Sequence, residues 1–456
     1  MGSNRNNLSS LKGDTKMKKL LAILLTILMI LSMVACGAKE EAPAVKEEAP
    51  AASEEKTEEK AEAPAEEQIT LKFTGWRTED EAAINAMNEK FTAEYPNIKV
   101  VYEPVTATEY DTNLQTSLSN GTAADIIMMR SYSGGKTVYS SGKIATLTTD
   151  NVPNLANFPD SAINCWAADG ESFAVPAGMT MEGVHYNKAI FEDVGVEVPE
   201  TLDELLDVCQ KIKDAGYLPI AGGVSEAWYV SEEITSSILM ATIGTNDWVQ
   251  KLYNKEIDFT DAAYVTMLET LQKLTPYYPD FYEGVGYEDA QALFVTGQAA
   301  MYMSGSFELQ FFTETNPDLQ LGCFPFPGQD AAAKAINFTA AVGVGAYADS
   351  PNLDAALTYL NWLASDEGGL AYANGVLGFF SPNPGASGLD NEIAAEWNAM
   401  SEGRETIHML GYETMTENAP DYSTAVADTV YKMCTEGWTA EEAAAYMQDQ
   451  MSWYFQ

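Results

Sequence analysis

Along residues 69–129, segments with the two-residue hydrophobic period of strands alternate with segments whose apolar residues have helical spacing. Residues 69–74 (ITLKFT) and 98–102 (IKVVY) place apolar side chains at every second position, which is typical of half-buried strands. Residues 124–129 (ADIIMM) form a continuous apolar run, as buried parallel strands do. This order of strand, helix, strand, helix, strand predicts an α/β fold with an open, mostly parallel sheet. The two intervening helices are indicated by apolar residues at helical spacing, namely Ile84, Met87 and Phe91, then Tyr110, Leu114 and Leu118.

A second group of elements begins near Pro176. Thr201 and Glu204 form a capping box, which predicts a helix over residues 202–215. The remaining elements that we expect are a helix followed by a strand within residues 291–304, an irregular turn at 324–328, a short strand at 342–347, a helix opened by Ser350-Pro351, and a last helix capped by Thr439 and Glu442.

Length and charge narrow the class of protein. Residues 69–456 exceed the size that one hydrophobic core usually serves, so two domains are expected. The chain has 67 acidic and 25 basic residues, which gives a formal net charge of −42 at pH 7. Such a charge argues against nucleic acid or an anionic membrane surface as a partner, and it favours a neutral or cationic ligand.

Motifs for catalysis and metal binding are scarce. His185 and His408 are the only histidines, and neither HExxH nor GxSxG occurs. Residues 133–137 (SGGKT) resemble the tail of a phosphate loop, but Arg130 stands where that loop needs glycine. We therefore expect no cofactor, no metal and no enzymatic activity, although the many acidic residues leave a glycosidase carboxylate pair open. Four cysteines without CxxC spacing are either two disulfides or four buried thiols: Cys165, Cys209, Cys323 and Cys434.

The N-terminal region reads as an export signal. Residues 17–37 (MKKLLAILLTILMILSMVACG) combine two lysines, an apolar stretch and small residues, and the apolar stretch is shorter than the ~20 residues that span a bilayer. The end resembles a bacterial lipobox with Met33 where leucine is usual, which implies lipidation of Cys36 and anchoring at the extracellular face of the cell membrane. Residues 1–16 read as an over-long start. Residues 37–68, acidic and without aromatics, predict a disordered tether.

The segment from Pro176 to Gly223 resembles the central signature of the extracellular solute-binding proteins of ABC importers, in the sugar-binding cluster similar to maltose-binding protein. It contains Tyr186-Asn187-Lys188, Phe191-Glu192, Gly195 and residues 199–205, with leucine at position 202 where tryptophan is common. Residues 91–105, 121–127, 297–307 (GQAAMYMSGSF) and 324–328 (FPFPG) resemble further segments of the family, so that the likeness extends over residues 69–455.

This resemblance implies a type II periplasmic-binding-protein fold of two α/β lobes. Each lobe would be a mostly parallel sheet flanked by helices, and the ligand would bind in a cleft that closes by hinge bending. Crossing strands are implied near residues 176–182, 337–341 and 378–383. The lobes would then be discontinuous, with residues 69–177 and 340–379 in the N-lobe and residues 178–339 and 380–456 in the C-lobe.

Candidate ligand contacts follow from what a sugar requires, namely aromatic faces and planar hydrogen-bonding groups. Trp76 and Arg77 follow the first strand, and Arg130 and Tyr132 follow the third, at the strand ends where open α/β sheets bind ligands. The alternatives are core packing for Trp76, a structural turn for Asp125 and hinge packing for Phe380. The full expected set is Trp76, Arg77, Asp125, Arg130, Tyr132, Glu182, Trp228, Ser304, Ser306, Phe307 and Phe380.

The sequence thus predicts a lipid-anchored, monomeric binding protein that captures a mono- or oligosaccharide outside the cell and delivers it to the permease of an ABC importer. One alternative is a binding protein for an amino sugar, a polyamine or a peptide, which an excess of carboxylates over aromatics in the cleft would favour. Two others are a glycan-degrading surface enzyme and a ligand sensor for a membrane kinase.

Overall fold

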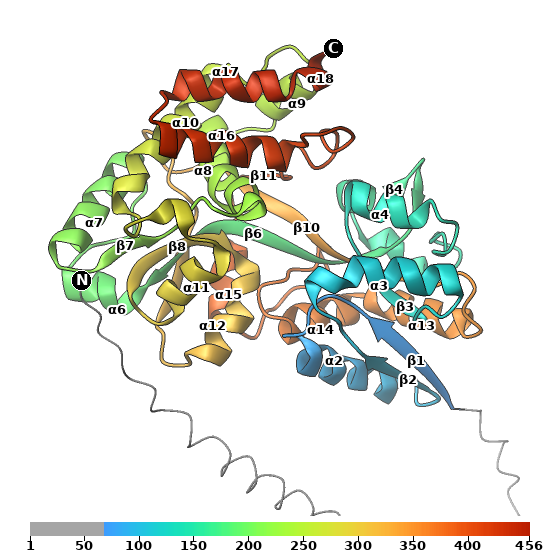
Figure 1. The fold of residues 1–456 in the computed structure, drawn as a ribbon. Helices are drawn as coiled ribbons and strands as arrows, with labels where there is room; N and C mark the ends of the chain where they lie inside the picture. The colour runs from blue at the N-terminus through green and yellow to red at the C-terminus, as the bar shows by residue number, and fades with distance from the viewer. Residues whose placement is uncertain (1–67) are drawn as a thin grey trace, which may run out of the picture. The chain divides into compact units, whose positions relative to one another are not determined.

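The computed structural model describes residues 68–456 of the chain, and Figure 1 traces its helices and strands in order. The predicted signal segment, Cys36 and nearly all of the acidic tether lie outside the described residues. Within residues 68–456, no helix combines the length and the apolar character that crossing a membrane requires.

The N-terminal α/β pattern is confirmed. The strands β1 (Ile69–Thr74), β2 (Ile98–Tyr102) and β3 (Ile126–Met129) are parallel, with β1 between the other two. The helices α2 (Glu81–Glu94) and α3 (Ala107–Asn120) connect them, and α3 ends at Gly121. Because Gly121 has a φ of 70°, the left-handed conformation that closes this helix suits glycine best.

Two long strands run through the middle of the sheet. β6 (Val175–Asn187) and β10 (Ala335–Ala346) are antiparallel to one another, and β10 is also antiparallel to β3. The strand expected at residues 342–347 is therefore longer, and the sheet is mixed rather than mostly parallel. β6 and β10 are buried along most of their length, so they lack the alternation that reveals a strand.

The second half of β6 has further strands as its neighbours in the sheet. It pairs with β8 (Ala299–Gly305) and β9 (Leu321–Phe324), while β8 is parallel to β7 (Leu218–Ala221) and β11 (Glu405–Ile407) is parallel to β10. The order β2-β1-β3-β10-β6-β8-β7 makes one continuous path of strands. β4 (Ala167–Ala168) and β5 (Glu171–Ser172) form a separate small pair.

Two large hydrophobic cores lie along this sheet. The first core is built on β1, β3 and the first half of β6, and it includes Phe73, Phe91 and Tyr359. The second core is built on β7, β8 and the end of β6, and it includes Leu268 and Tyr302. Because β6 and β10 contribute to both cores, any ligand that lies against these strands is held near both.

The helices cover the sheet, and the predicted capping boxes of α7 (Leu202–Asp214) and α17 (Ala440–Gln450) are confirmed. The predicted helix after Ser350 is α13 (Leu353–Leu363). The others are α4 (Tyr132–Tyr139), α5 (Asp160–Asn164), α6 (Lys188–Val194), α8 (Thr235–Ile243), α9 (Asp247–Tyr253), α10 (Ala262–Leu274), α11 (Tyr287–Val295), α12 (Leu309–Thr315), α14 (Asp366–Gly375), α15 (Glu392–Ala399), α16 (Tyr422–Glu436) and α18 (Ser452–Phe455).

A short backbone bridge joins β6 to the segment around Phe380. The amide of Phe380 donates to the carbonyl of Met179 at 2.8 Å, and the reverse bond has the same length. Beside it, Ser306 Oγ donates to the carbonyl of Gly378 at 2.6 Å and accepts from the amide of Met181 at 3.1 Å. Ser306 therefore fastens β6 to the segment around Gly378.

The cysteines and His185 are structural in this fold. All four cysteines in the described part are free thiols; Cys165 and Cys209 are buried and the other two are partly buried, so two disulfides are not formed. His185 lies fully buried in β6, with Nε2 2.9 Å from the carbonyl oxygen of Gly305. Burial lowers the pKa of His185 to about 4, against the opposing effect of that carbonyl, so the ring is neutral near pH 7.

Candidate functional site

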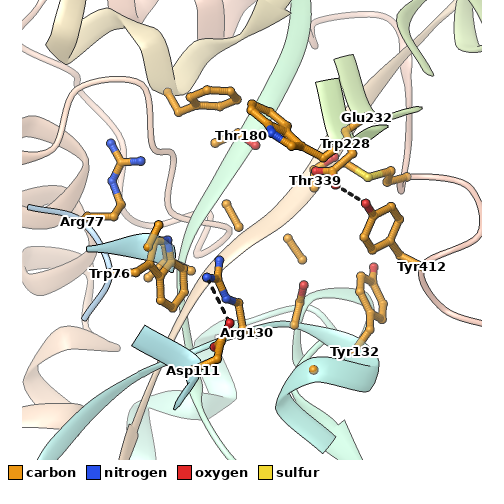
Figure 2. A pocket seen from close by; sticks show the side chains of 18 of the residues that line it. Trp76, Arg77, Asp111, Arg130, Tyr132, Thr180, Trp228, Glu232, Thr339 and Tyr412 are labelled. Carbon is orange, nitrogen blue, oxygen red and sulfur yellow. Dashed lines mark hydrogen bonds and ion pairs between the residues drawn. The ribbon is translucent and has the colours of Figure 1, made fainter. Parts of the chain in front are cut away.

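A cavity of about 1150 Å³ lies where the strand ends of the first core face helices of the second core. Figure 2 shows its side chains, which come from both cores and from the long strands β6 and β10. Seven of the eleven residues expected to contact ligand line this cavity: Trp76, Arg77, Arg130, Tyr132, Glu182, Trp228 and Phe307.

Arg77 is held in place by acidic neighbours. It follows β1 and donates through Nε to Asp80, and its Nη2 lies 3.2 Å from Glu79. Its guanidinium lies 4.5 Å from the centroid of the Phe379 ring. Burial opposes the charge of Arg77, but Asp80 and Glu79 raise its pKa above the ordinary value. The guanidinium of Arg77 therefore lines the cavity in a fixed position, and Asp80 and Glu79 balance its positive charge.

Trp76 and Arg130 form a pair at the carboxyl ends of β1 and β3. The guanidinium of Arg130 lies 4.0 Å from the centroid of the Trp76 ring, which is within the range of a cation–π contact. Arg130 Nη2 also lies 3.6 Å from a carboxylate oxygen of Asp111, as the dashed line in Figure 2 shows. Trp76 packs edge-on against Tyr110, at 5.3 Å between ring centroids. One face of Trp76 is thus occupied by Arg130.

Tyr132 occupies a strained position at the start of α4. Its φ is 50°, a conformation that costs a non-glycine residue free energy and that clusters at functional sites. Its amide donates to the carbonyl of Cys165 at 2.8 Å, and its hydroxyl lies 3.2 Å from Cys165 Sγ. These contacts hold Tyr132 in the wall of the cavity.

The second core supplies its side of the cavity through a π-helix, η2 (Tyr229–Ile234), that begins directly after Trp228. The wider turn places the consecutive residues Glu232 and Glu233 in the lining, and such turns are frequent at functional sites. Trp228 is partly buried and donates through Nε1 to Glu226 at 2.5 Å. Its ring centroid lies 4.6 Å from that of Tyr287.

Four glutamates line the same side of the cavity: Glu182 from β6, Glu232 and Glu233 from the π-helix, and Glu308 from η5 (Ser306–Glu308). Glu182, Glu233 and Glu308 are each at most 2% exposed. Among residues 68–456, the ion pairs with Lys or Arg include none of the four. Acidic and basic groups are therefore distributed unevenly around the cavity, since the four glutamates on this side have no basic partner in the described part of the chain.

Burial shifts the pKa of these glutamates upward. It raises the pKa of Glu232 to about 7, although the Tyr412 hydroxyl and the more distant Arg130 oppose the shift. Burial and the charge of Glu232 hold the pKa of Glu182 well above its ordinary range. Burial and the surrounding carboxylates do the same for Glu233, and burial raises the pKa of Glu308. Each charge that forms in this group makes the next more costly.

Four expected contacts lie outside the cavity lining. Asp125 precedes β3, at the opposite end of the strand from Arg130, and accepts bonds from the Lys72 amide and from Ser350 Oγ. The fold thus uses Asp125 as a structural anchor. Ser304, Ser306 and Phe380 are buried; Ser304 donates to Glu308 at 3.2 Å, and Phe380 packs in a small cluster with Met181 and Trp397.

Several lining residues were not expected from the sequence. Thr180 and Thr339 lie on the long strands, and Tyr412 donates to Glu232 from the segment before α16 (Figure 2). The pair Glu232-Glu233 carried a weak signal, because two adjacent acids stand between the apolar residues Val230 and Ile234. Tyr412 carried none, since it follows no predicted strand. The other lining residues that sequence reasoning missed include Tyr287, Gln291, Glu308 and Phe311.

Comparison with known proteins identifies the family of this chain. Residues 74–370 match the model of the family described as bacterial extracellular solute-binding protein. The multiple sugar-binding protein of Streptococcus mutans is 24% identical over 276 residues, a match that spans 59% of this chain and 65% of that protein. The diacetylchitobiose binding protein DasA of Streptomyces coelicolor is 28% identical over 277 residues, spanning 57% of this chain and 62% of that one.

A solved structure agrees on the fold. The bacterial solute receptor AcbH, described as having an exclusive preference for β-D-galactopyranose, superposes with a TM-score of 0.71 at 18% identity, covering 85% of this chain and all of AcbH. The fold is the mixed α/β type of the type II periplasmic binding proteins. With a family match that covers more than half of its residues, this chain belongs to the bacterial extracellular solute-binding proteins.

Proposed function

We propose that this protein captures a saccharide in the described cavity, outside the cell, and delivers it unaltered to the permease of an ABC importer. The observation that carries the proposal is the combination of aromatic faces and polar groups around one cavity of about 1150 Å³, drawn from both hydrophobic cores. Trp228 and Trp76 can cover the apolar face of a pyranose, while Arg77, Thr180 and Thr339 can meet its hydroxyls.

The sugar-binding names of the relatives support the same ligand class. The division into an N-lobe (residues 69–177 and 340–379) and a C-lobe (residues 178–339 and 380–456) is part of the proposal. Its support is that two separate cores share only the strands that pass between them. A ligand that contacts both lobes would shift their equilibrium toward a closed form, which the permease would bind.

Lipidation at Cys36 and anchoring at the outer face of the membrane complete the proposal, and their support is the residue pattern at 17–37. The transport role requires that the bound sugar be released intact. The carboxylate pair of a glycosidase is the alternative chemistry, and the four clustered glutamates make it worth testing.

Titration calorimetry and thermal unfolding across a panel of mono- and oligosaccharides would test the proposal. A true ligand should raise the free energy of unfolding by RT ln(1 + [L]/Kd), and the unfolding temperature should rise with it. Chromatography of the same mixtures after a day should recover each sugar unchanged. New reducing ends would replace the transport function with a hydrolytic one, and the absence of any saccharide ligand would overturn the proposal.

A further inference from the structure

The glutamates of the cavity differ in how well the protein satisfies them. Glu308 accepts bonds from Gln291 at 2.7 Å, Tyr302 at 3.1 Å and Ser304 at 3.2 Å. Glu232 accepts from the hydroxyl of Tyr412. These two side chains have protein partners that fix their orientation.

Glu182 and Glu233 are left with a free acceptor each. Within residues 68–456, the Oε2 atoms of Glu182 and Glu233 have no hydrogen-bond partner, and both residues line the cavity while being only 2% and 1% exposed. The remaining contact of Glu182 is a long bond from Thr180 Oγ1, at 3.4 Å. Leaving a buried carboxylate unsatisfied costs free energy, so a partner that enters with the ligand would be bound strongly.

Aromatic rings line the same cavity as these carboxyl groups. Trp228, Tyr229 and Tyr287 form a cluster with ring centroids 4.6–6.2 Å apart, and two of them line the cavity. The faces of such rings attract cations, as carboxylates do. A site that combines both has the chemistry that recognises an ammonium group rather than a hydroxyl.

The basic residues of the cavity do not compete for this role. Arg77 is paired with Asp80 and Glu79, and Arg130 is placed between Trp76 and Asp111. Both arginines follow strands of the first core, whereas the unsatisfied glutamates lie on β6 and the π-helix. The cation that would balance Glu182 and Glu233 is therefore not supplied by the lining of this cavity.

We propose that Glu182 and Glu233, with the rings of Trp228 and Tyr287, form a subsite for a protonated amine, so that the preferred solute is an amino-substituted saccharide. This inference rests on the proposed function, since it specifies which saccharide the same cavity selects. Burial favours the neutral form of both carboxyl groups as long as no cation is near. An ammonium group beside them would lower their pKa, so that they ionise as the amine binds. The amine would then donate to the free Oε2 atoms, while its sugar ring would contact the aromatic and threonine side chains of the cavity.

The test compares sugars that differ in one substituent. Calorimetry at pH 7 would use glucose with glucosamine and N-acetylglucosamine, galactose with galactosamine, and cellobiose with its diamino and diacetamido analogues, and spermidine would serve as an amine without a sugar. The amine member of at least one set should bind about tenfold or more tightly than its hydroxyl and acetamido partners, the gain typical of a charge-assisted hydrogen bond.

Each outcome separates the two proposals. Equal or tighter binding of a neutral sugar would overturn the amine subsite and leave saccharide transport standing. Binding of spermidine alone would support the cationic subsite and overturn the saccharide as ligand. Binding of none of these compounds would overturn both.

An isosteric double variant tests the residues themselves. Glu182→Gln with Glu233→Gln should weaken amine binding about tenfold or more while changing the affinity for the hydroxyl analogue less than about threefold. The matched control is Glu402→Gln with Glu436→Gln, which changes the net charge equally at two exposed positions outside the cavity. An equal loss of amine affinity in both double variants would assign the preference for the amine to overall charge and overturn the subsite. If the variant with Glu182→Gln and Glu233→Gln does not fold, the comparison of sugars on the wild-type protein still decides.

Discussion

The guanidinium of Arg130 lies 4.0 Å from the centre of the Trp76 ring and joins the carboxyl ends of β3 and β1. This contact makes the two tryptophans of the cavity unequal. Trp76 has one face covered by Arg130, whereas Trp228 has contacts with Tyr229 and Tyr287 in tilted or edge geometry. The two residues are separated by the cavity, so that a sugar would meet one ring from each core.

We expect Trp228→Ala to weaken binding of the preferred saccharide more than Trp76→Ala does. The loss for Trp228→Ala should be about tenfold or greater, because stacking on a large ring contributes on the order of 1 kcal/mol beyond the area that it buries. Calorimetry on both variants measures the difference. A larger loss for Trp76→Ala would mean that Arg130 leaves the ring when ligand binds.

The elevated pKa of Glu232, about 7, predicts a pH dependence of stability. In the unfolded chain a glutamate loses its proton near its ordinary pKa of 4.5, so the folded state binds more protons between pH 4.5 and 7. The contribution of Glu232 to the free energy of unfolding is therefore fully favourable below pH 4.5 and is lost as the pH rises through 7.

Glu232→Gln should consequently gain stability relative to the wild type as the pH rises from 4.5 through 7. Urea unfolding at several pH values measures the difference in free energy. Glu182, Glu233 and Arg130 influence the charge on Glu232 in the folded state, so these groups set how steep the change is. A difference that is flat with pH would show that Glu232 ionises as it would in water.

Ser306→Ala should lower the free energy of unfolding by about 1–3 kcal/mol, because it leaves the buried amide of Met181 and the carbonyl of Gly378 short of a partner. Ser140→Ala is the control, since Ser140 is exposed and makes only a local bond to Thr137. Denaturant titration of both variants gives the comparison. Equal effects would mean that Ser306 does not fasten β6 to the segment around Gly378.

Gly378→Ala should be more damaging. A Cβ atom at Gly378 would lie 1.8 Å from the carbonyl oxygen of Ser306, and the φ of 87° is unfavourable for alanine. We expect a loss of about 3 kcal/mol or more in unfolding free energy. Gly388→Ala isolates the conformational part, because its φ is 99° but nothing lies near its Cβ, and it should cost only about 1–2 kcal/mol. Similar losses at the two glycines would rule out the close approach as the cause.

Cys36→Ser should release the protein from the membrane fraction into the medium or the periplasm without changing its ligand affinity, since position 36 precedes residues 68–456 that hold the cavity. Fractionation of cells that express each form, followed by calorimetry on the purified proteins, would show this. Continued membrane association of the serine variant would remove lipidation as the anchor.

The elements and site residues that the sequence predicted correctly are those marked by signals within a few neighbouring positions. The alternation in residues 69–74 specified β1, the capping box of Thr201 and Glu204 specified the start of α7, and the ends of β1 and β3 pointed to Trp76 and Arg130. Each of these signals depends on neighbouring residues, which is why they are visible without the fold. The rule on strand ends did not point to Asp125, which precedes β3 and lies at the edge opposite the cavity.

The sequence by itself determined the α/β class, the helices and strands with clear periods or caps, and the strand ends that supply Trp76, Arg77 and Arg130. Only the tertiary structure decided the span of β6 and β10, whose burial removes the alternating pattern. It also decided that Glu182, Glu232, Glu233 and Glu308 meet, since they lie up to 126 positions apart in sequence and no local pattern encodes which distant carboxylates share one cavity. Burial then sets their pKa values, because the cost of a charge depends on what surrounds it in space.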